Sequence, residues 1–151
     1  MDYELLCAQL SGLAEADGWY VPLMANAAAL LYDALEDVNW AGFYLLRDGR
    51  LVLGPFQGKV ACIHIPLGQG VCGTAAQRDE TQLVPDVHAF PGHIACDSAS
   101  KSELVVPIHR NGSVVAVLDI DSPVPNRFSE ADRAGLEALV KVLEAHIELD
   151  V

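Results

Sequence analysis

Residues 39–57, NWAGFYLLRDGRLVLGPFQ, contain the pattern that decides the fold. Residues 39–47 and 51–57 read as strands, because apolar and aromatic side chains dominate both runs without helical spacing. Asp48 and Gly49 lie between them, and this dipeptide supplies the positive backbone angles of a tight hairpin turn. The stretch therefore predicts two antiparallel strands.

A second hairpin is expected from residues 103–109 and 113–121, around Asn111 and Gly112. The turn has two possible forms, a two-residue turn at 111–112 or a three-residue loop at 110–112 with Gly112 in the left-handed conformation. We favour the three-residue loop, because it produces one continuous apolar face for the helices. That face would consist of Leu104, Val106, Ile108, Val114, Ala116, Leu118 and Ile120.

The form of this turn also decides which side chains meet across the hairpin. A two-residue turn would place Glu103 opposite Ile120, whereas the three-residue loop places Glu103 opposite Asp119. The second register brings Glu103, Asp119 and Asp121 together at one end of the opposite face. Three carboxylates repel one another there, so at least one should have a raised pKa and keep its proton near neutrality. The alternative is a set of solvated surface acids.

Helices are expected on both sides of the two hairpins. Apolar spacing predicts helices at 2–16, 21–37, 71–78 and 130–148, and short strands at 62–66 and 82–84. Ser129, with Asp132 three residues on, matches a capping box at the start of the last helix. The order predicts an α+β fold with a central antiparallel sheet, helices packed on one face, and a pocket with a covering loop on the other. Residues 1–151 are read as a single domain.

Composition narrows the classes of partner. A chain of 151 residues is about the size of one domain, and its formal charge of −12 would repel nucleic acid and anionic membranes. No apolar run reaches 18 residues, and the N-terminus lacks an export signal. We expect a cytoplasmic protein that acts on a small cationic or zwitterionic ligand.

The first strand also offers an aromatic surface on one side. Trp40, Gly42 and Tyr44 alternate onto one face. A glycine between two large rings would leave a gap for the apolar part of a ligand. Aromatic core packing is the alternative interpretation.

Three of the four cysteines lie where thiol chemistry is plausible. Cys96 occurs in residues 86–103, a long segment with neither helical nor strand periodicity, and Cys62 and Cys72 precede it. Long loops are usually functional, so we interpret Cys96 as a reactive thiol, with an inert thiol under the loop as the alternative. Cys7 belongs to the apolar face of the first helix and is set aside.

Gly68, Gly70 and Gly73 spell G-x-G-x-x-G, but hairpins replace the parallel strand–helix–strand units that a dinucleotide site requires. The glycine-rich helix start would still present N–H groups, from Val71 to Gly73, to a ligand carboxylate. It would also favour the thiolate of Cys72.

A zinc site is conceivable for Cys62 and Cys72 with His88 and His93. None of the paired C-x-x-C spacings of structural zinc occurs, so no metal is expected.

Five segments together resemble the free methionine-(R)-sulfoxide reductases, small enzymes with a GAF fold. They are NWAGFYLL, GPFQGKVACI, GQGVCGTA, DVHAFPGHIACDSASKSELVVP and VLDIDSP. The resemblance implies that Cys96 is the nucleophile, that Cys62 resolves it as a disulfide, and that Cys72 is an auxiliary thiol. It further implies substrate contacts at Trp40, Tyr44, Glu103, Asp119 and Asp121, a homodimer, and recycling by thioredoxin with no bound cofactor.

A mechanism follows from that resemblance. Cys96 attacks the sulfoxide sulfur, and Glu103 or Asp121 donates a proton to the departing oxygen. Asp119 pairs with the substrate ammonium, and the methyl group rests on Trp40. The main alternatives are a GAF sensor for a small ligand and a thiol-based oxidant sensor, neither of which would turn over a substrate.

Overall fold

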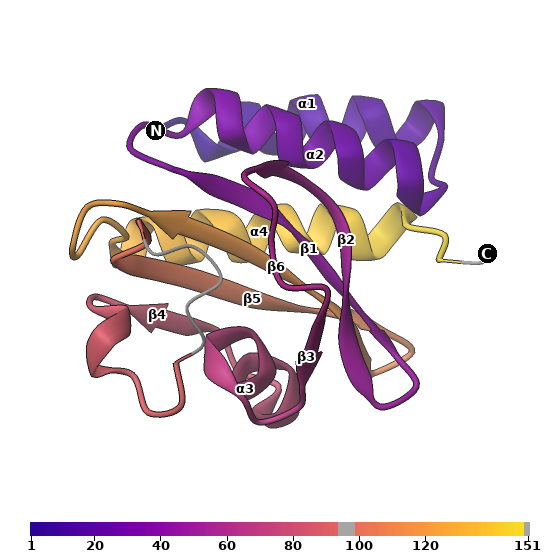
Figure 1. Cartoon of the computed structure of the whole chain (residues 1–151). Coiled ribbons are helices and arrows are strands. Elements are labelled where there is room, and N and C mark those ends of the chain that lie inside the picture. The colour runs from indigo at the N-terminus through magenta and orange to yellow at the C-terminus, as the bar shows by residue number, and fades with distance from the viewer. Residues whose placement is uncertain (94–98, 150–151) are drawn as a thin grey trace.

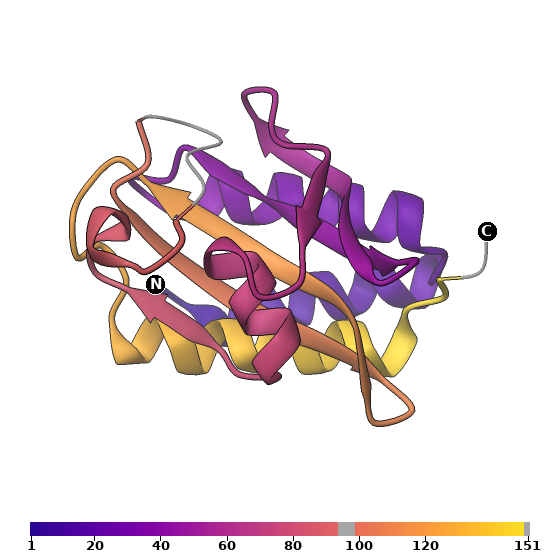
Figure 2. The same cartoon turned by 60° about the horizontal axis from the view of Figure 1, so that its bottom comes forward.

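The computed structural model describes residues 1–93 and 99–149. A six-stranded antiparallel sheet, in the order β3-β2-β1-β6-β5-β4, separates α1, α2 and α4 on one face from α3 on the other (Figures 1 and 2). The helices are α1 (Tyr3–Ala16), α2 (Tyr20–Ala34), α3 (Gly70–Arg78) and α4 (Glu130–His146), with a 3-10 turn η1 (Val87–Ala89). The strands are β1 (Trp40–Arg47), β2 (Arg50–Gly58), β3 (His64–Pro66), β4 (Gln82–Val84), β5 (Ser102–Arg110) and β6 (Ser113–Ser122).

The predicted α+β layering is confirmed. The apolar core lies between the sheet and α1, α2 and α4, and its strand members include Phe43, Leu104, Leu118 and Ile120. Helix α3 lies on the opposite face against β5 and β6 (Figure 2). Residues of its first turn line a pocket there. None of the helices in the described part of the chain is both long and apolar enough to cross a bilayer.

Local sequence signals explain the element boundaries. Asp48 and Gly49 have φ values of 54° and 78°, which confirms the predicted tight turn between β1 and β2. Ser129 accepts a hydrogen bond from the Asp132 amide, and the Asp132 side chain accepts one from the Ser129 amide, so the capping box is also confirmed. The Tyr3 hydroxyl donates to Asp132 at 2.6 Å and thereby ties α1 to the start of α4.

The second hairpin differs from the prediction in its turn. Arg110 pairs with Ser113, so the turn has two residues, Asn111 and Gly112, with φ values of 53° and 79°. The three-residue loop was wrong. A two-residue turn of this kind matches the twist of the flanking strands when both central residues accept positive φ, as asparagine and glycine do.

A bulge then shifts the register of this hairpin. His109 pairs with Val114 and Ile108 pairs with Ala116, so Val115 falls between the paired residues. Val115 packs with the helix-side core, while Val114 turns to the pocket side, contrary to the predicted apolar face. Beyond the bulge Glu103 lies opposite Asp121, a pairing that neither proposed turn alone would give.

Candidate active site

A cavity of about 40 Å³ lies between α3 and the pocket face of the sheet. Its lining comes from β1, β5, β6, the first turn of α3 and the loops that surround them. Among the predicted site residues, those that line it are Trp40, Tyr44, Val71, Cys72, Glu103, Asp119 and Asp121. Segments far apart in the sequence therefore meet at one site.

The three predicted carboxylates do converge. Glu103 lies opposite Asp121 across the β5–β6 ladder, and Asp119 lies two residues along β6 on the same face. Glu103 and Asp119 are only 7% and 5% exposed, so the alternative of solvated surface acids does not hold for them. The convergence is confirmed, although the bulge at Val115, and not a three-residue loop, produces it.

Burial and mutual repulsion determine the protonation of this group. Burial raises the pKa of Glu103 well above its usual range, and the nearby charges of Asp119 and Asp121 raise it further. Burial also raises the pKa of Asp119, whereas its hydrogen-bonding contacts with Glu103, Cys72 and Asp121 lower it. Glu103 is thus the carboxyl that keeps a proton, and Asp119 is the one whose neighbours favour the charged form.

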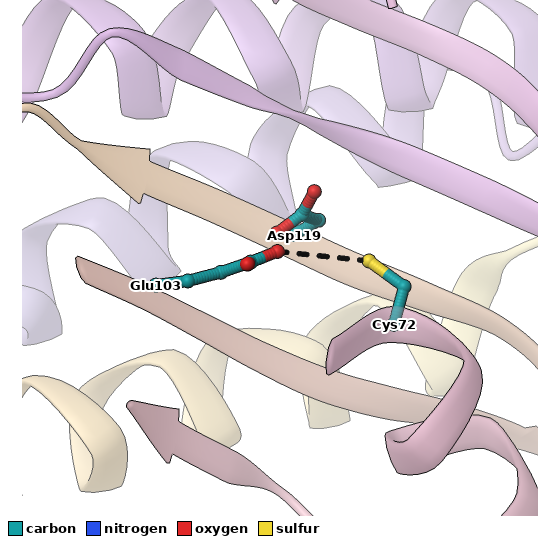
Figure 3. Close-up of side chains that lie close together, drawn as sticks. All are labelled: Cys72, Glu103 and Asp119. Atoms are coloured by element: carbon teal, nitrogen blue, oxygen red, sulfur yellow. Dashed lines mark hydrogen bonds between the residues drawn. The ribbon is translucent and has the colours of Figure 1, made fainter. Parts of the chain in front are cut away.

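Cys72 projects from α3 toward the two buried carboxyl groups (Figure 3). Its Sγ donates to Oε2 of Glu103 at 3.8 Å. Burial, followed by the Asp119 and Glu103 charges, raises the pKa of this thiol well above its usual range. The predicted thiolate at the helix N-terminus was therefore wrong, because desolvation and negative charge outweigh the helix dipole.

Stacked rings form the wall of the cavity on β1. The Trp40 ring stacks on Tyr44 with centroids 5.8 Å apart and on Phe56 with centroids 5.1 Å apart. The predicted gap at Gly42 does not exist, because a Cβ there would lie 2.2 Å from the Cβ of Phe56. Gly42 instead admits Phe56 from β2, which holds the Trp40 indole in place.

Cys62 lies beside this aromatic wall. The Tyr44 hydroxyl donates to the Cys62 carbonyl at 3.1 Å, which fixes the segment between β2 and β3. Cys62 takes part in a disulfide, whereas Cys7 and Cys72 are free. Cys96 lies outside the described residues, so the predicted Cys62–Cys96 pairing stays a prediction.

The start of α3 supplies fewer amides than predicted. The Gly73 amide donates to the Gln69 carbonyl at 3.1 Å, and a Cβ on Gly73 would meet the Pro66 carbonyl oxygen at 2.5 Å. Gly73 thus packs against the end of β3, and it is not among the residues that line the cavity. The amide of Val71, in the first helical turn, has no partner within the helix. It is therefore a better candidate than the Gly73 amide for binding a ligand carboxylate.

His93 lines the cavity, although its sequence position suggested only a zinc ligand. Its Nδ1 is buried and has no hydrogen-bond partner within residues 1–93 and 99–149. Burial, then the nearby His88, lowers its pKa, so the ring is neutral near pH 7. The sequence signal was its position in the same loop as Cys96, but a lone histidine in a loop is more often a solvated surface residue.

Comparison with known proteins places this geometry in a family. The model of the GAF domain family matches residues 24–148. The free methionine-R-sulfoxide reductase of Escherichia coli is 52% identical over 94% of this chain and 86% of that protein. The chain belongs to the GAF-domain family of free methionine-R-sulfoxide reductases.

Solved structures of relatives have the same fold throughout. The reduced fRMsr of Staphylococcus aureus is 50% identical, covers 97% of this chain and 96% of its own, and superposes with a TM-score of 0.94. The Neisseria meningitidis free methionine-R-sulfoxide reductase in complex with its substrate is 42% identical, with 95% and 87% coverage and a TM-score of 0.92. The predicted family and fold class are confirmed.

Proposed function

We propose that this reductase-family chain converts free L-methionine (R)-sulfoxide to L-methionine using its own thiols. One observation of the structure carries the proposal: Glu103 and Asp119 lie side by side, both buried, in a cavity walled by Trp40, and burial raises the pKa of Glu103 well above its usual range. A sulfoxide needs a proton donor for its oxygen, and a free amino acid needs an anion for its ammonium group. The relatives named above, at about 50% identity, support the same substrate.

The chemical step uses Cys96 as nucleophile. Its thiolate attacks the sulfoxide sulfur while Glu103 protonates the oxygen, and Asp121 is the second candidate donor. The S–O oxygen passes to Cys96, so methionine leaves and Cys96 becomes a sulfenic acid. Sulfur in the substrate is thereby reduced and the Cys96 sulfur is oxidised by the same two electrons.

Two further thiols complete the cycle. The Cys62 thiol displaces water from the Cys96 sulfenic acid and forms a disulfide, which an external dithiol reduces. The participation of Cys62 in a disulfide supports its role as the resolving thiol. Cys72, buried and bonded to Glu103, is a reserve thiol that exchanges into this disulfide after it forms.

Substrate contacts follow from the chemistry of the lining. Asp119 would bind the ammonium group, since its Oδ1 is buried without a partner in the described part of the chain. Trp40 and Tyr44 would hold the thioether end, and the Val71 amide would face the carboxylate. Gly73 would act by letting α3 approach β3 closely, not by touching the substrate.

The surroundings of the reaction are also proposals. Thioredoxin fits as the external dithiol, because the cycle needs a two-electron thiol reductant and no bound cofactor. A reducing cytoplasm would keep the free thiols available. We further propose a homodimer, which a molar-mass measurement in solution would test.

The decisive experiment mixes the reduced protein with racemic free methionine sulfoxide and a dithiol. The (R) epimer should disappear while an equal amount of methionine forms, and Cys96→Ser should abolish this turnover. Cys7→Ser is the matched control and should leave the rate unchanged. A wild-type protein that binds the sulfoxide without releasing methionine would instead identify a sensor.

A further inference from the structure

Cys72, Glu103 and Asp119 form a buried group with two kinds of metal ligand, and we call it the thiol–carboxylate cluster (Figure 3). One sulfur and two carboxylate oxygens lie within 4.8 Å of one another, and the Cys72–Glu103 pair is 3.8 Å apart. The three residues come from α3, β5 and β6, so rigid elements hold the donor atoms in position.

A second observation concerns Asp119, whose carboxylate lacks a partner on one oxygen within residues 1–93 and 99–149. Asp119 is 5% exposed, lines the cavity, and has an Oδ1 atom with no hydrogen-bond partner among the described residues. An unpaired buried carboxylate oxygen is costly, so it indicates a cationic ligand that the protein alone does not supply. The substrate ammonium is one such ligand, but the neighbouring sulfur of Cys72 is a ligand suited to a metal ion.

The geometry fits a tetrahedral ion. Zinc bound through sulfur at about 2.3 Å and oxygen at about 2.0–2.2 Å has ligand atoms roughly 3.5 Å apart, so small side-chain movements would complete three ligands here. The cavity of about 40 Å³ beside the cluster leaves room for one water as the fourth ligand. A thiolate with two carboxylates favours Zn²⁺ over Mg²⁺ or Ca²⁺, which prefer oxygen alone.

We propose that the thiol–carboxylate cluster binds one Zn²⁺ ion through Cys72 Sγ, Glu103 and Asp119, and that this ion excludes the substrate ammonium from Asp119. Zinc would then be a reversible inhibitor. The C-x-x-C test applied to the sequence could not detect such a site, because its ligands come from three separate elements. The binding itself does not depend on the proposed reductase activity.

Direct binding tests the site without any turnover. The protein is first brought to the state of this structure, with Cys62 in its disulfide and Cys72 free, and mass mapping of its thiols checks that Cys72 has not exchanged. It is then titrated with ZnCl₂ by calorimetry, and Co²⁺ replaces zinc for spectroscopy. We expect one ion per chain and a thiolate-to-cobalt charge-transfer band. Cys72→Ala should remove the band and weaken zinc binding by more than the roughly 10- to 100-fold that loss of a supporting group costs.

Cys7→Ala is the matched control, because Cys7 is the other free thiol among the described residues and lies on α1. It should keep the band and the affinity. Asp119→Asn, checked for folding by thermal unfolding, should weaken zinc binding as Cys72→Ala does. The proposal would be overturned if Cys72→Ala and Asp119→Asn both bound zinc as tightly as the wild-type protein. It would also be overturned if the wild-type protein bound no zinc at micromolar concentration.

Competition with free methionine tests separately whether the zinc ion and the substrate occupy the same position. If both ligands use Asp119, saturating methionine should raise the apparent zinc dissociation constant of the wild-type protein. Unchanged zinc affinity would refute the shared position, while the Cys72→Ala result would still decide the zinc site.

Discussion

Alternate residues of β5 and β6 serve opposite purposes on the two faces of one sheet. Leu104 and Ile120 are fully enclosed by the helix-side core, whereas Glu103 and Asp119, their neighbours in sequence, bury carboxyl groups on the pocket face. Burying apolar side chains stabilises the fold, and burying like charges costs free energy. One face therefore provides the stability that lets the other face hold a group of mutually repelling carboxyls.

The strongest test of this difference between the faces places a carboxylate on the helix face, one residue away from Asp119. Ile120→Asp would bury an unpaired charge on the helix face, where Ile120 is 0% exposed. We expect a loss of more than about 5 kcal/mol, comparable with the whole stability of a domain, and hence no cooperative unfolding transition. Circular dichroism during thermal unfolding measures this. Ile120→Val is the matched control and should cost only about 0.5–1.5 kcal/mol; a well-folded Ile120→Asp protein would contradict the division between the faces.

The reverse pattern is expected on the pocket face. Glu103→Gln removes the proton donor and keeps the shape, so kcat should fall by about 10²- to 10⁴-fold, as for loss of a general acid. Stability should stay the same or rise, because burial and the neighbouring charges oppose ionisation of Glu103 in the folded protein, and glutamine removes the ionisation that favours the unfolded state. Steady-state kinetics and denaturant unfolding on one preparation separate the two effects. The exposed Glu80→Gln is the control, and equal losses of rate in both variants would remove Glu103 from the mechanism.

The pH dependence of stability sharpens the comparison further. The pKa of Glu103 is raised in the folded protein, so between its unfolded and folded pKa values the folded state binds more protons. The free energy of unfolding should therefore fall as pH rises from the unfolded value of Glu103 through its folded value. Glu103→Gln should flatten that decline, as measured by urea unfolding at a series of pH values. A decline of equal slope in the variant would show that another group causes it.

The sequence predicted the layers better than the pairing of side chains. Asp48–Gly49 and the Ser129–Asp132 capping box are local signals, and both structures form as their residues dictate. The bulge at Val115 has no such signal, because it lies within an apolar run, SVVAV at 113–117, where each residue could face either side. The prediction that the three carboxylates converge was therefore correct, although the turn from which it was derived was not.

The errors at the site have one physical cause, which is burial supplied by distant segments. Phe56 on β2 fills the space at Gly42. Burial of Cys72, followed by the charges of the carboxyl groups on β6 and β5, raises the pKa of its thiol and so reverses its expected ionisation. The His93 ring lines the cavity, which the sequence does not reveal. From the sequence, His93 was considered only as a possible zinc ligand. Motifs identify which residues carry chemistry, but tertiary packing decides their charge.

The smallest expected effect concerns the turn that sets the register of both faces. Gly112 has a φ of 79°, so Gly112→Ala should cost about 1 kcal/mol through backbone strain, even though the space around it is open. Gly12 is the matched control: it lies in α1 with nothing within 4 Å of an added Cβ, and Gly12→Ala should stabilise by about 0.5–1 kcal/mol. If urea unfolding shows a lower free energy of unfolding for Gly112→Ala and a higher one for Gly12→Ala, the two-residue turn is supported. If Gly112→Ala were neutral, the residue would not need the left-handed conformation, and the pairing of Glu103 with Asp121 would have to be held by the bulge at Val115 alone.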